Sequence, residues 1–253
     1  MSSYKIYPTL LDSFEWWRGA ETEEDAKQRE AELVAKLNRE YQEPSYAASR
    51  GTALNNCVDA VLQGTKVDVP LERLECDASE SGVYRDGTPE VPVLYTFVDG
   101  FKFVFSEELV LSIADHVGDA VVQPLLVATL DTCYGEVELY GFADYINVDT
   151  IIDLKSTNDY TVGKYRDHWQ HRVYPLLAVR SGMMERVACF EYLVAELRSG
   201  KEPLDGTLYR EQYHADVAVS ENELRDMLET EFLPWLEAHR EQITNNKIFG
   251  GEG

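Results

Sequence analysis

The chain has 253 residues, of which 44% are hydrophobic and 27% charged, so it can bury a sizeable core and is not expected to be disordered. Its 46 Asp and Glu residues outnumber 23 Lys and Arg residues, which gives a formal net charge of −23. A generic polybasic binder of nucleic acid or of anionic membranes is therefore excluded. The net charge does not exclude contact with a phosphate backbone through one locally basic strip or through bridging metal ions.

The amino terminus has no apolar signal-peptide core, and the longest apolar run, residues 121–130, is broken by Gln123 and Pro124. We therefore expect no membrane span and a soluble, cytoplasmic protein of a bacterial or phage-infected cell. The four cysteines are scattered and form no Cys-x-x-Cys pair, which disfavours structural zinc and a local iron–sulfur loop.

The first half of the chain predicts three helices, over residues 9–17, 23–41 and 50–62, the last stopped by Gly64. Residues 65–90 are polar and rich in turn formers, so we expect an irregular insertion there. Asp99-Gly100 lies between the apolar runs 91–98 and 101–105 and predicts a hairpin. Ser106 followed by two acids predicts a capped helix that extends to about Val117.

The second half predicts strands over residues 121–130, 136–147 and 150–154, then a helix over about 162–179. Strands over 187–197 and 207–219 follow, and an amphipathic helix at about 220–246 closes the chain. This order predicts a single α/β domain over residues 1–253, with a mixed central sheet and helices on both faces.

Two acidic residues from adjoining predicted strands stand out. A tight turn around residues 147–150 would bring Asp144 and Asp153 to the same edge of a hairpin, and Lys155 leaves the same strand face as Asp153. Burying these charges is costly unless something balances them, and hard carboxylate ligands suit Mg²⁺ or Mn²⁺. Lys155 would then position or deprotonate a water and stabilise charge on a phosphate.

The helix that follows adds groups suited to phosphate. Gln170 and Tyr174 are i, i+4 neighbours, and Arg166 is expected one turn earlier on the same stripe. Residues 155–186 hold six Lys and Arg against three acids, so this window is basic within an acidic chain. The competing structural interpretation is a solvated acidic pair at a hairpin edge, with Lys155 as an ordinary salt-bridge partner of Asp153. The occurrence of Asp144, Asp153, Lys155 and the Gln170–Tyr174 helix in this sequence order favours the metal site over that interpretation.

Three motifs together resemble a known family: Gly-x-x-Asp (141–144), Asp-x-Lys (153–155) followed by Ser-Thr, and Gln-x-x-x-Tyr (170–174). In this order and spacing they resemble the RecB-like branch of the PD-(D/E)XK nucleases, which includes phage recombination exonucleases and CRISPR-associated exonucleases. Residues 9–17 and Arg50-Gly-Thr-Ala-Leu54 are also similar to segments of that family. The resemblance covers roughly residues 8–60 and 135–195 and implies a restriction-endonuclease-like fold.

The resemblance also implies roles for particular residues. The implied catalytic residues are Asp144, Asp153 and Lys155. The implied metal ligands are Asp144, Asp153, the carbonyl of Leu154, and Asn55, which stands where many members carry a histidine. Gln170 and Tyr174 are implied as groups that orient the site or hold DNA, and we expect Arg166, Ser156 and Arg50 as further DNA contacts. We expect Mg²⁺ or Mn²⁺ as cofactor and no iron–sulfur cluster, because the carboxy-terminal cysteines of some relatives are missing.

The resulting hypothesis is a metal-dependent DNA nuclease, foremost an exonuclease acting on DNA ends in recombination, repair or phage DNA processing. The alternative is a catalytically weak or inactive DNA-binding or assembly subunit of a recombination or packaging complex, motivated by Asn55 and the acidity. An acidic mimic of DNA is disfavoured, because a mimic needs no ordered catalytic face. DNA is the expected partner, with a recombination or single-strand-annealing protein and a homo-oligomer as further candidates, and no membrane.

Overall fold

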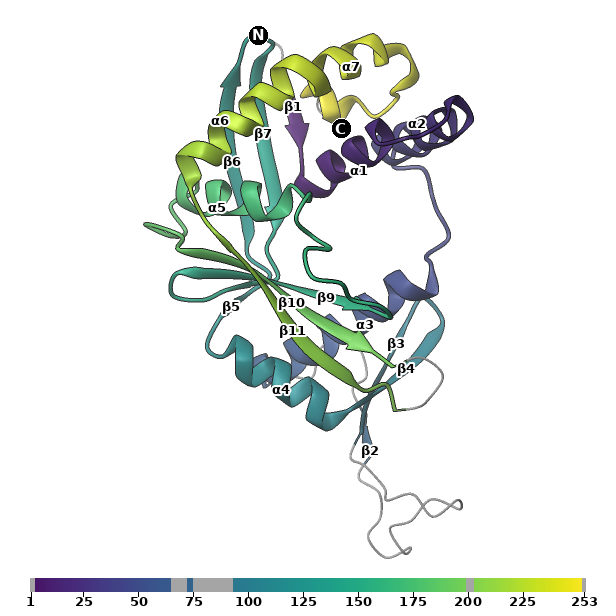
Figure 1. The fold of residues 1–253 in the computed structure, drawn as a ribbon, viewed down its shortest axis with the longest axis vertical. Coiled ribbons are helices and arrows are strands. Elements are labelled where there is room, and N and C mark those ends of the chain that lie inside the picture. The colour runs from purple at the N-terminus through teal and green to yellow at the C-terminus, as the bar shows by residue number, and fades with distance from the viewer. Residues whose placement is uncertain (1–2, 65–71, 75–92, 199–202, 252–253) are drawn as a thin grey trace, which may run out of the picture.

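The computed structural model describes residues 3–64, 72–74, 93–198 and 203–251. Sheets and helices alternate along these residues, and helices pack on both faces of the central strands (Figure 1). The predicted mixed α/β architecture is therefore confirmed. The insertion expected over residues 65–90 lies outside the described residues, apart from the short strand β2 (Glu72–Leu74).

The amino-terminal part consists of one strand and three helices: β1 (Ser3–Ile6), α1 (Pro8–Arg18), α2 (Glu23–Leu37) and α3 (Tyr46–Gln63). Local chemistry sets their ends. The side chains of Thr22 and Ser45 accept hydrogen bonds from backbone N–H groups in the first turns of α2 and α3, as N-cap residues do. Gly64 ends α3 with a φ of 58°, a left-handed conformation that glycine adopts without strain.

The predicted hairpin is confirmed as β3 (Val93–Val98) and β4 (Phe101–Ser106), which pair in antiparallel register. Asp99 and Gly100 both have positive φ, 50° and 81°, as the two-residue turn of a twisted hairpin requires. The Ser106 hydroxyl accepts from the N–H of Leu109 at 3.2 Å and caps α4 (Glu107–Val117), so this helix is confirmed as well.

Two sheets form the centre of the molecule. In the first, β1 runs parallel to β7 (Gly135–Phe142), which pairs with β6 (Leu125–Thr132). The second has the order β11-β10-β9-β8-β5, and its strands are β5 (Val121–Val122), β8 (Tyr145–Ile146), β9 (Thr150–Thr157), β10 (Cys189–Leu197) and β11 (Gly206–His214).

The strands expected over residues 121–130 and 136–147 are each split between these two sheets, so both predictions were too long. Between β5 of the second sheet and β6 of the first, the chain bends at Gln123, whose φ is 48°, and at Pro124, which has no N–H for a ladder. Across the hairpin, the N–H of Gln123 donates to the carbonyl of Asp144 at 2.8 Å. Asp144 therefore lies at the bend between the two sheets.

The carboxy-terminal part contains α5 (Gln170–Arg180), α6 (Val217–Met227), a π-helical segment (Leu228–Phe232) and α7 (Leu233–Ala238). The helix expected from about residue 162 begins only at Gln170, because residues 162–167 form turns that include Gly163 at a φ of 84°. The helix expected over about 220–246 begins at Val217 and ends at Ala238. None of the helices in the described part of the chain is long and apolar enough to cross a membrane.

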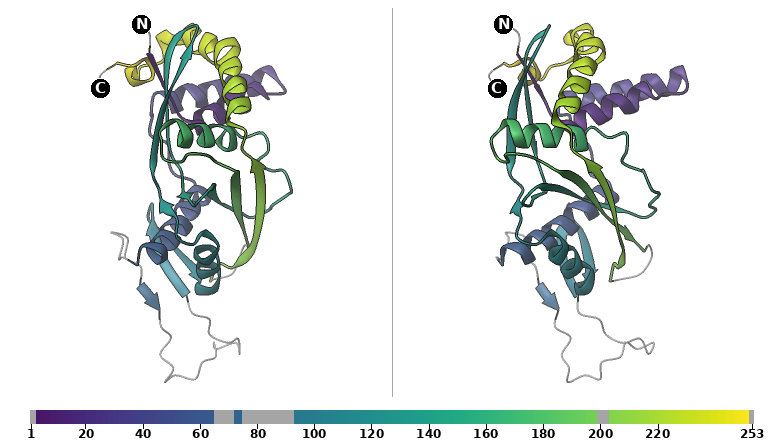
Figure 2. Two further views of the ribbon diagram at one scale, coloured as in Figure 1. Left: turned by 90° about the vertical axis from the view of Figure 1, so that its left-hand side faces the viewer. Right: turned by 60° about the vertical axis from the view of Figure 1, so that its left-hand side comes forward.

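Two hydrophobic clusters lie on opposite faces of β9 and β10. Ile151 and Tyr192 pack in the cluster that includes α5, α6 and α7, whereas Ile152 and Leu193 pack in the cluster that includes α3 and α4. Figures 1 and 2 show these two groups of helices on either side of the five-stranded sheet. Because successive side chains of a strand alternate, Asp153 and Lys155 leave β9 on the side of α5.

A buried carboxylate fastens β10, β11 and α4 together. Glu191 of β10 is 1% exposed, pairs with Arg210 and Gln212 of β11 at 2.8 Å each, and contacts His116 of α4. Burial raises the pKa of Glu191, but its hydrogen bonds from Arg210, His116 and Gln212 outweigh this and hold the pKa below the ordinary 4.5. A carboxylate whose pKa is lower in the folded than in the unfolded state stabilises the fold at pH values above its unfolded-state pKa. This stability is lost as the pH falls through the folded-state pKa.

We predict that Glu191→Gln lowers the free energy of unfolding by about 1–3 kcal/mol near neutral pH, because a charged acceptor of several donors is lost. Urea unfolding at about pH 7 and about pH 4 should also show a smaller loss of stability on acidification than in the wild type. Glu223→Gln is the matched control, since its 3.5 Å contact with Arg172 is at the surface. Equal acid sensitivity of Glu191→Gln and wild type would contradict the assignment.

Candidate active site

Asp144 and Asp153 lie opposite each other across a hairpin. Tyr145 pairs with Ile152 in antiparallel register, so the residues directly outside this pair, Asp144 and Asp153, face each other at the bend. The Oδ2 atom of Asp144 accepts the backbone N–H of Leu154 at 2.8 Å. Asp153 is 5% exposed. The two carboxylates therefore share one small, largely desolvated space, as the spacing of the motifs predicted.

The proximity of two carboxylates changes their protonation. Burial, followed by the charge of Asp153, raises the pKa of Asp144 to about 8, although Lys155 and the Leu154 N–H oppose the shift. Burial lowers the pKa of Lys155, but its contact with Asp153 reverses this and leaves the pKa above the ordinary 10.5. Lys155 is therefore held as an ammonium, while Asp144 is easily protonated in the absence of another cation.

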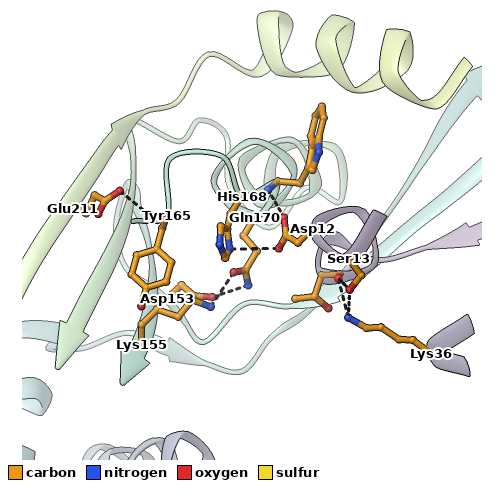
Figure 3. A network of polar contacts seen from close by, with 11 residues as sticks. Asp12, Ser13, Lys36, Asp153, Lys155, Tyr165, His168, Gln170 and Glu211 are labelled. Atoms are coloured by element: carbon orange, nitrogen blue, oxygen red, sulfur yellow. Dashed lines mark hydrogen bonds and ion pairs between the residues drawn. The ribbon is translucent and has the colours of Figure 1, made fainter. Parts of the chain in front are cut away.

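Lys155, Gln170 and Asp153 form a closed triangle of polar contacts (Figure 3). The Nζ atom of Lys155 lies 2.7 Å from Oδ2 of Asp153 and donates to Oε1 of Gln170 at 2.8 Å. The Nε2 atom of Gln170 donates to Oδ1 of Asp153 at 2.9 Å. The structure thus brings the Asp-x-Lys motif of β9 into direct contact with the first residue of α5, and each side chain is fixed by the other two.

The start of α5 is held by a residue that the sequence analysis did not single out. Asp12 of α1 accepts the backbone N–H of Trp169 at 2.5 Å and lies 3.6 Å from Nδ1 of His168 (Figure 3). Burial raises the pKa of Asp12, and the hydrogen bond from Trp169 and the charge of His168 only partly oppose this. By binding the residue next to Gln170, Asp12 positions the amide that holds Lys155. No local pattern marks this long-range contact in the sequence.

Tyr174 explains the glycine of the Gly-x-x-Asp motif. Its hydroxyl donates to the carbonyl of Phe142 at 2.8 Å, and burial, with the charges of Asp153 and Asp144, raises its pKa. A Cβ atom on Gly141 would lie only 3.0 Å from both Cε1 and the hydroxyl oxygen of Tyr174 and 3.3 Å from Pro8. The missing side chain therefore lets Tyr174 pack beside the strand that leads to Asp144.

One face of α3 lines the other side of the hairpin. Asp59 accepts from the Tyr145 hydroxyl at 2.9 Å and from Gln123 Nε2 at 2.6 Å, and its charge contributes to the raised pKa of Asp144. Asn55 lies one turn earlier on the same face, and its Oδ1 atom is buried without a hydrogen-bond partner among the described residues. Asp59 was missed by the sequence analysis, although its i, i+4 spacing from Asn55 is a usable signal.

Three of the expected DNA contacts differ in their exposure: one is buried, one half-buried and one exposed. Arg50 is 4% exposed and donates to Asn158, so it braces the end of β9 and is not on the surface. Ser156 is half-buried, with its hydroxyl beside Gly51 of α3. Arg166 is exposed, but it lies in the turns before α5 and not on the stripe of Gln170 and Tyr174. Arg166 is not on that stripe because the segment before Gln170 forms turns where the sequence predicted a helix.

The donor set fits a hard divalent cation. Within the described ranges, no three or more His, Cys, Asp and Glu side chains gather in a way that could hold a metal ion by themselves. A cation between Asp144 and Asp153 would therefore complete its ligands with neutral oxygens, and the unpaired Oδ1 atom of Asn55 is one that is buried on the facing helix. A cation would also relieve the repulsion that raises the pKa of Asp144.

Comparison with known proteins agrees with this geometry. The family model of the PD-(D/E)XK nuclease superfamily matches residues 20–248. The chain therefore belongs to the PD-(D/E)XK nuclease superfamily, and its mixed α/β fold is consistent with the restriction-endonuclease-like fold. Membership indicates a nuclease of the kind that generally uses divalent metals such as Mg²⁺.

Other comparisons add little. A solved structure titled "Crystal structure of SSO0001" is similar, with 12% sequence identity and a TM-score of 0.29, over 47% of this chain and 54% of that chain. The match spans about half the length of that protein and is too weak to inform the fold or the function. No curated protein matches the chain significantly.

We predict that Gly141→Ala destabilises the protein by about 1–3 kcal/mol, because the new methyl group must displace Tyr174 or Pro8. Gly19→Ala is the matched control: a Cβ there meets backbone oxygens at 3.5 Å and 3.7 Å, which are ordinary contacts. Urea unfolding of the two variants measures the difference. If Gly141→Ala were as stable as Gly19→Ala, the close approach of Tyr174 would not be required.

Proposed function

We propose that the protein is a divalent-metal-dependent DNA nuclease of the RecB-like branch, formed by a single domain over residues 1–253. Its proposed activity is that of an exonuclease on DNA ends in recombination, repair or phage DNA processing, in company with a recombination or single-strand-annealing protein. The observation that carries the proposal is the meeting of Asp144, Asp153 and Lys155 at one bend of the hairpin. Support for the branch comes from Gln170, which contacts both Asp153 and Lys155.

In this proposal Asp144 and Asp153 hold the metal, with the carbonyl of Leu154 and the amide oxygen of Asn55 as further ligands. When bound, Mg²⁺ supplies Lewis-acid stabilisation of the scissile phosphate and lowers the pKa of a bound water. The hydrogen bond from Leu154 to Asp144 keeps that carboxylate turned toward β9. The role of the acidic pair is therefore to concentrate negative charge where a cation and a phosphate must meet.

Lys155 is better suited to stabilise charge than to remove a proton. Its raised pKa, caused by Asp153 despite the opposing effect of burial, keeps the ammonium protonated in the metal-free site. A fixed ammonium can donate to a phosphate oxygen as negative charge develops during attack by water. Gln170 holds this ammonium in place, and Tyr174 packs behind the strand that carries Asp144. Of the two roles that the sequence allowed for Lys155, we therefore propose the electrostatic one.

The test is degradation of linear duplex DNA with Mg²⁺ or Mn²⁺ by wild type, Asp153→Asn and Lys155→Ala. We expect each site variant to lose about 100-fold or more in rate, the size of effect seen when a charge-stabilising group is removed. Asp226→Asn and Lys27→Ala, which change exposed residues of α6 and α2, are the matched controls and should retain activity. Covalently closed circular DNA should survive, because an exonuclease needs an end.

Two outcomes would contradict the proposal. Equal degradation by wild type and both site variants would place the activity elsewhere. An intact wild type that binds DNA and Mg²⁺ but degrades nothing would favour the alternative of an inactive assembly subunit, for which the amide of Asn55 in place of a histidine would be the first explanation.

A further inference from the structure

A groove lined by tyrosines and arginines lies beside the site. We call it the tyrosine groove; its cavity measures about 340 Å³, near the lower end of the range for small-molecule sites, and its lining includes Tyr160, Gly163, Arg166, Tyr209, Arg210 and Tyr213. The rings of Tyr160 and Tyr209 lie 4.8 Å apart with an angle of 30° between their planes. Tyr209 keeps 37% of its surface exposed, so part of this residue is accessible to a ligand.

The groove is built on one buried carboxylate. Glu211 of β11 is 8% exposed and accepts from the Tyr160 hydroxyl at 2.9 Å, from the N–H of Gly163 at 3.2 Å and from the N–H of Tyr165 at 3.3 Å. It also accepts from the Tyr213 hydroxyl. These donors fix the segment between β9 and α5 against the edge strand of the sheet. The groove is therefore preformed, and a ligand need not order it.

One residue connects the tyrosine groove to the candidate active site. The backbone of Tyr165 is bound to Glu211, while its ring stacks on Tyr192 with centroids 4.9 Å apart. In Figure 3 this ring extends from the side of Glu211 toward Asp153 and Lys155. Burial raises the pKa of Tyr165, and the charge of Lys155 partly lowers it, so the two sites are within electrostatic reach. Tyr165 thus joins the tyrosine groove to the candidate active site.

Arg166 brings a guanidinium group to the tyrosine groove. Arg166 is exposed and has no ion-pair partner within the residues that the structure describes. Arg210 also lines the groove, but its guanidinium pairs with Glu191 on the opposite face of β11 from Tyr209 and Glu211. The guanidinium of Arg166 beside the rings of Tyr160 and Tyr209 makes a local site for a phosphate and a flat ring.

We propose that the tyrosine groove binds an unpaired nucleotide of the DNA strand whose phosphodiester enters the site of Asp144 and Asp153, with the base stacked on Tyr209 and a phosphate on Arg166. This inference rests on the proposed function as a DNA nuclease and assigns its preferred substrate end: a single-stranded one. Inside a duplex the faces of the bases are covered by their neighbours, and only the terminal pair exposes one face, so paired DNA offers the groove less stacking surface than an unpaired nucleotide.

The test is fluorescence anisotropy with a labelled single-stranded oligonucleotide and the matching blunt duplex, measured in EDTA so that cleavage plays no part. We expect wild type to bind the single strand more tightly, and Tyr209→Ala and Arg166→Ala each to weaken that binding about fivefold or more, with little change for the duplex. Tyr209→Phe keeps the ring and should restore binding. Tyr41→Ala, which removes a ring that is 87% exposed between α2 and α3, and Lys27→Ala are the matched controls.

The groove assignment would be wrong if Tyr209→Ala and Arg166→Ala left single-strand affinity unchanged, or if they weakened single-strand and duplex binding equally. It would also be wrong if the only effect of these variants were a change in oligomeric state, because that would indicate a protein interface. These failures are distinct from failure of the proposed function. If Asp153→Asn abolishes DNA degradation while the groove variants bind DNA like wild type, the proposed nuclease activity is supported and the proposed role of the tyrosine groove is wrong. If the groove variants lose single-strand binding but the wild type degrades no DNA, the tyrosine groove is a DNA-binding site and the proposed nuclease activity is wrong.

Discussion

The structure depends on the encounter of two carboxylates at the bend of a hairpin. Asp144 and Asp153 face each other in antiparallel register, and burial together with mutual repulsion raises the pKa of Asp144 to about 8. Such an arrangement is costly unless positive charge and hydrogen-bond donors compensate it. The Leu154 N–H and the Lys155 ammonium supply part of that compensation, and a divalent cation would supply the rest.

The surrounding fold holds these charges in place from two sides of β9. On one side α5 contributes Gln170, and α1 fixes the start of that helix through Asp12. On the other side α3 presents Asn55 and Asp59. Because each contact joins elements far apart in the chain, the site forms only when both hydrophobic clusters are assembled. The charged centre and the packing of the domain are therefore inseparable.

Sequence patterns predicted what short-range geometry determines. The Asp99-Gly100 turn, the Ser106 cap and the facing of Asp144 and Asp153 follow from turn chemistry and strand alternation, and the structure agrees. The long strands were wrong where the chain bends between two sheets, because apolar patterning continues through the bend. The start of α5 was wrong because Glu211, far along the chain, captures the N–H groups of the preceding turns. Asp12 and the buried position of Arg50 likewise arise from tertiary contacts.

The most direct measurement is anomalous diffraction from crystals of the wild-type protein soaked in Mn²⁺. We expect one strong peak between the side chains of Asp144 and Asp153, with the Asn55 amide oxygen in its coordination shell, and no such peak in Asp144→Asn. The proposed metal site would be wrong if Mn²⁺ bound elsewhere in the protein and not at the hairpin bend. It would also be wrong if the side chains of Asp144 and Asp153 pointed apart into the apolar interior.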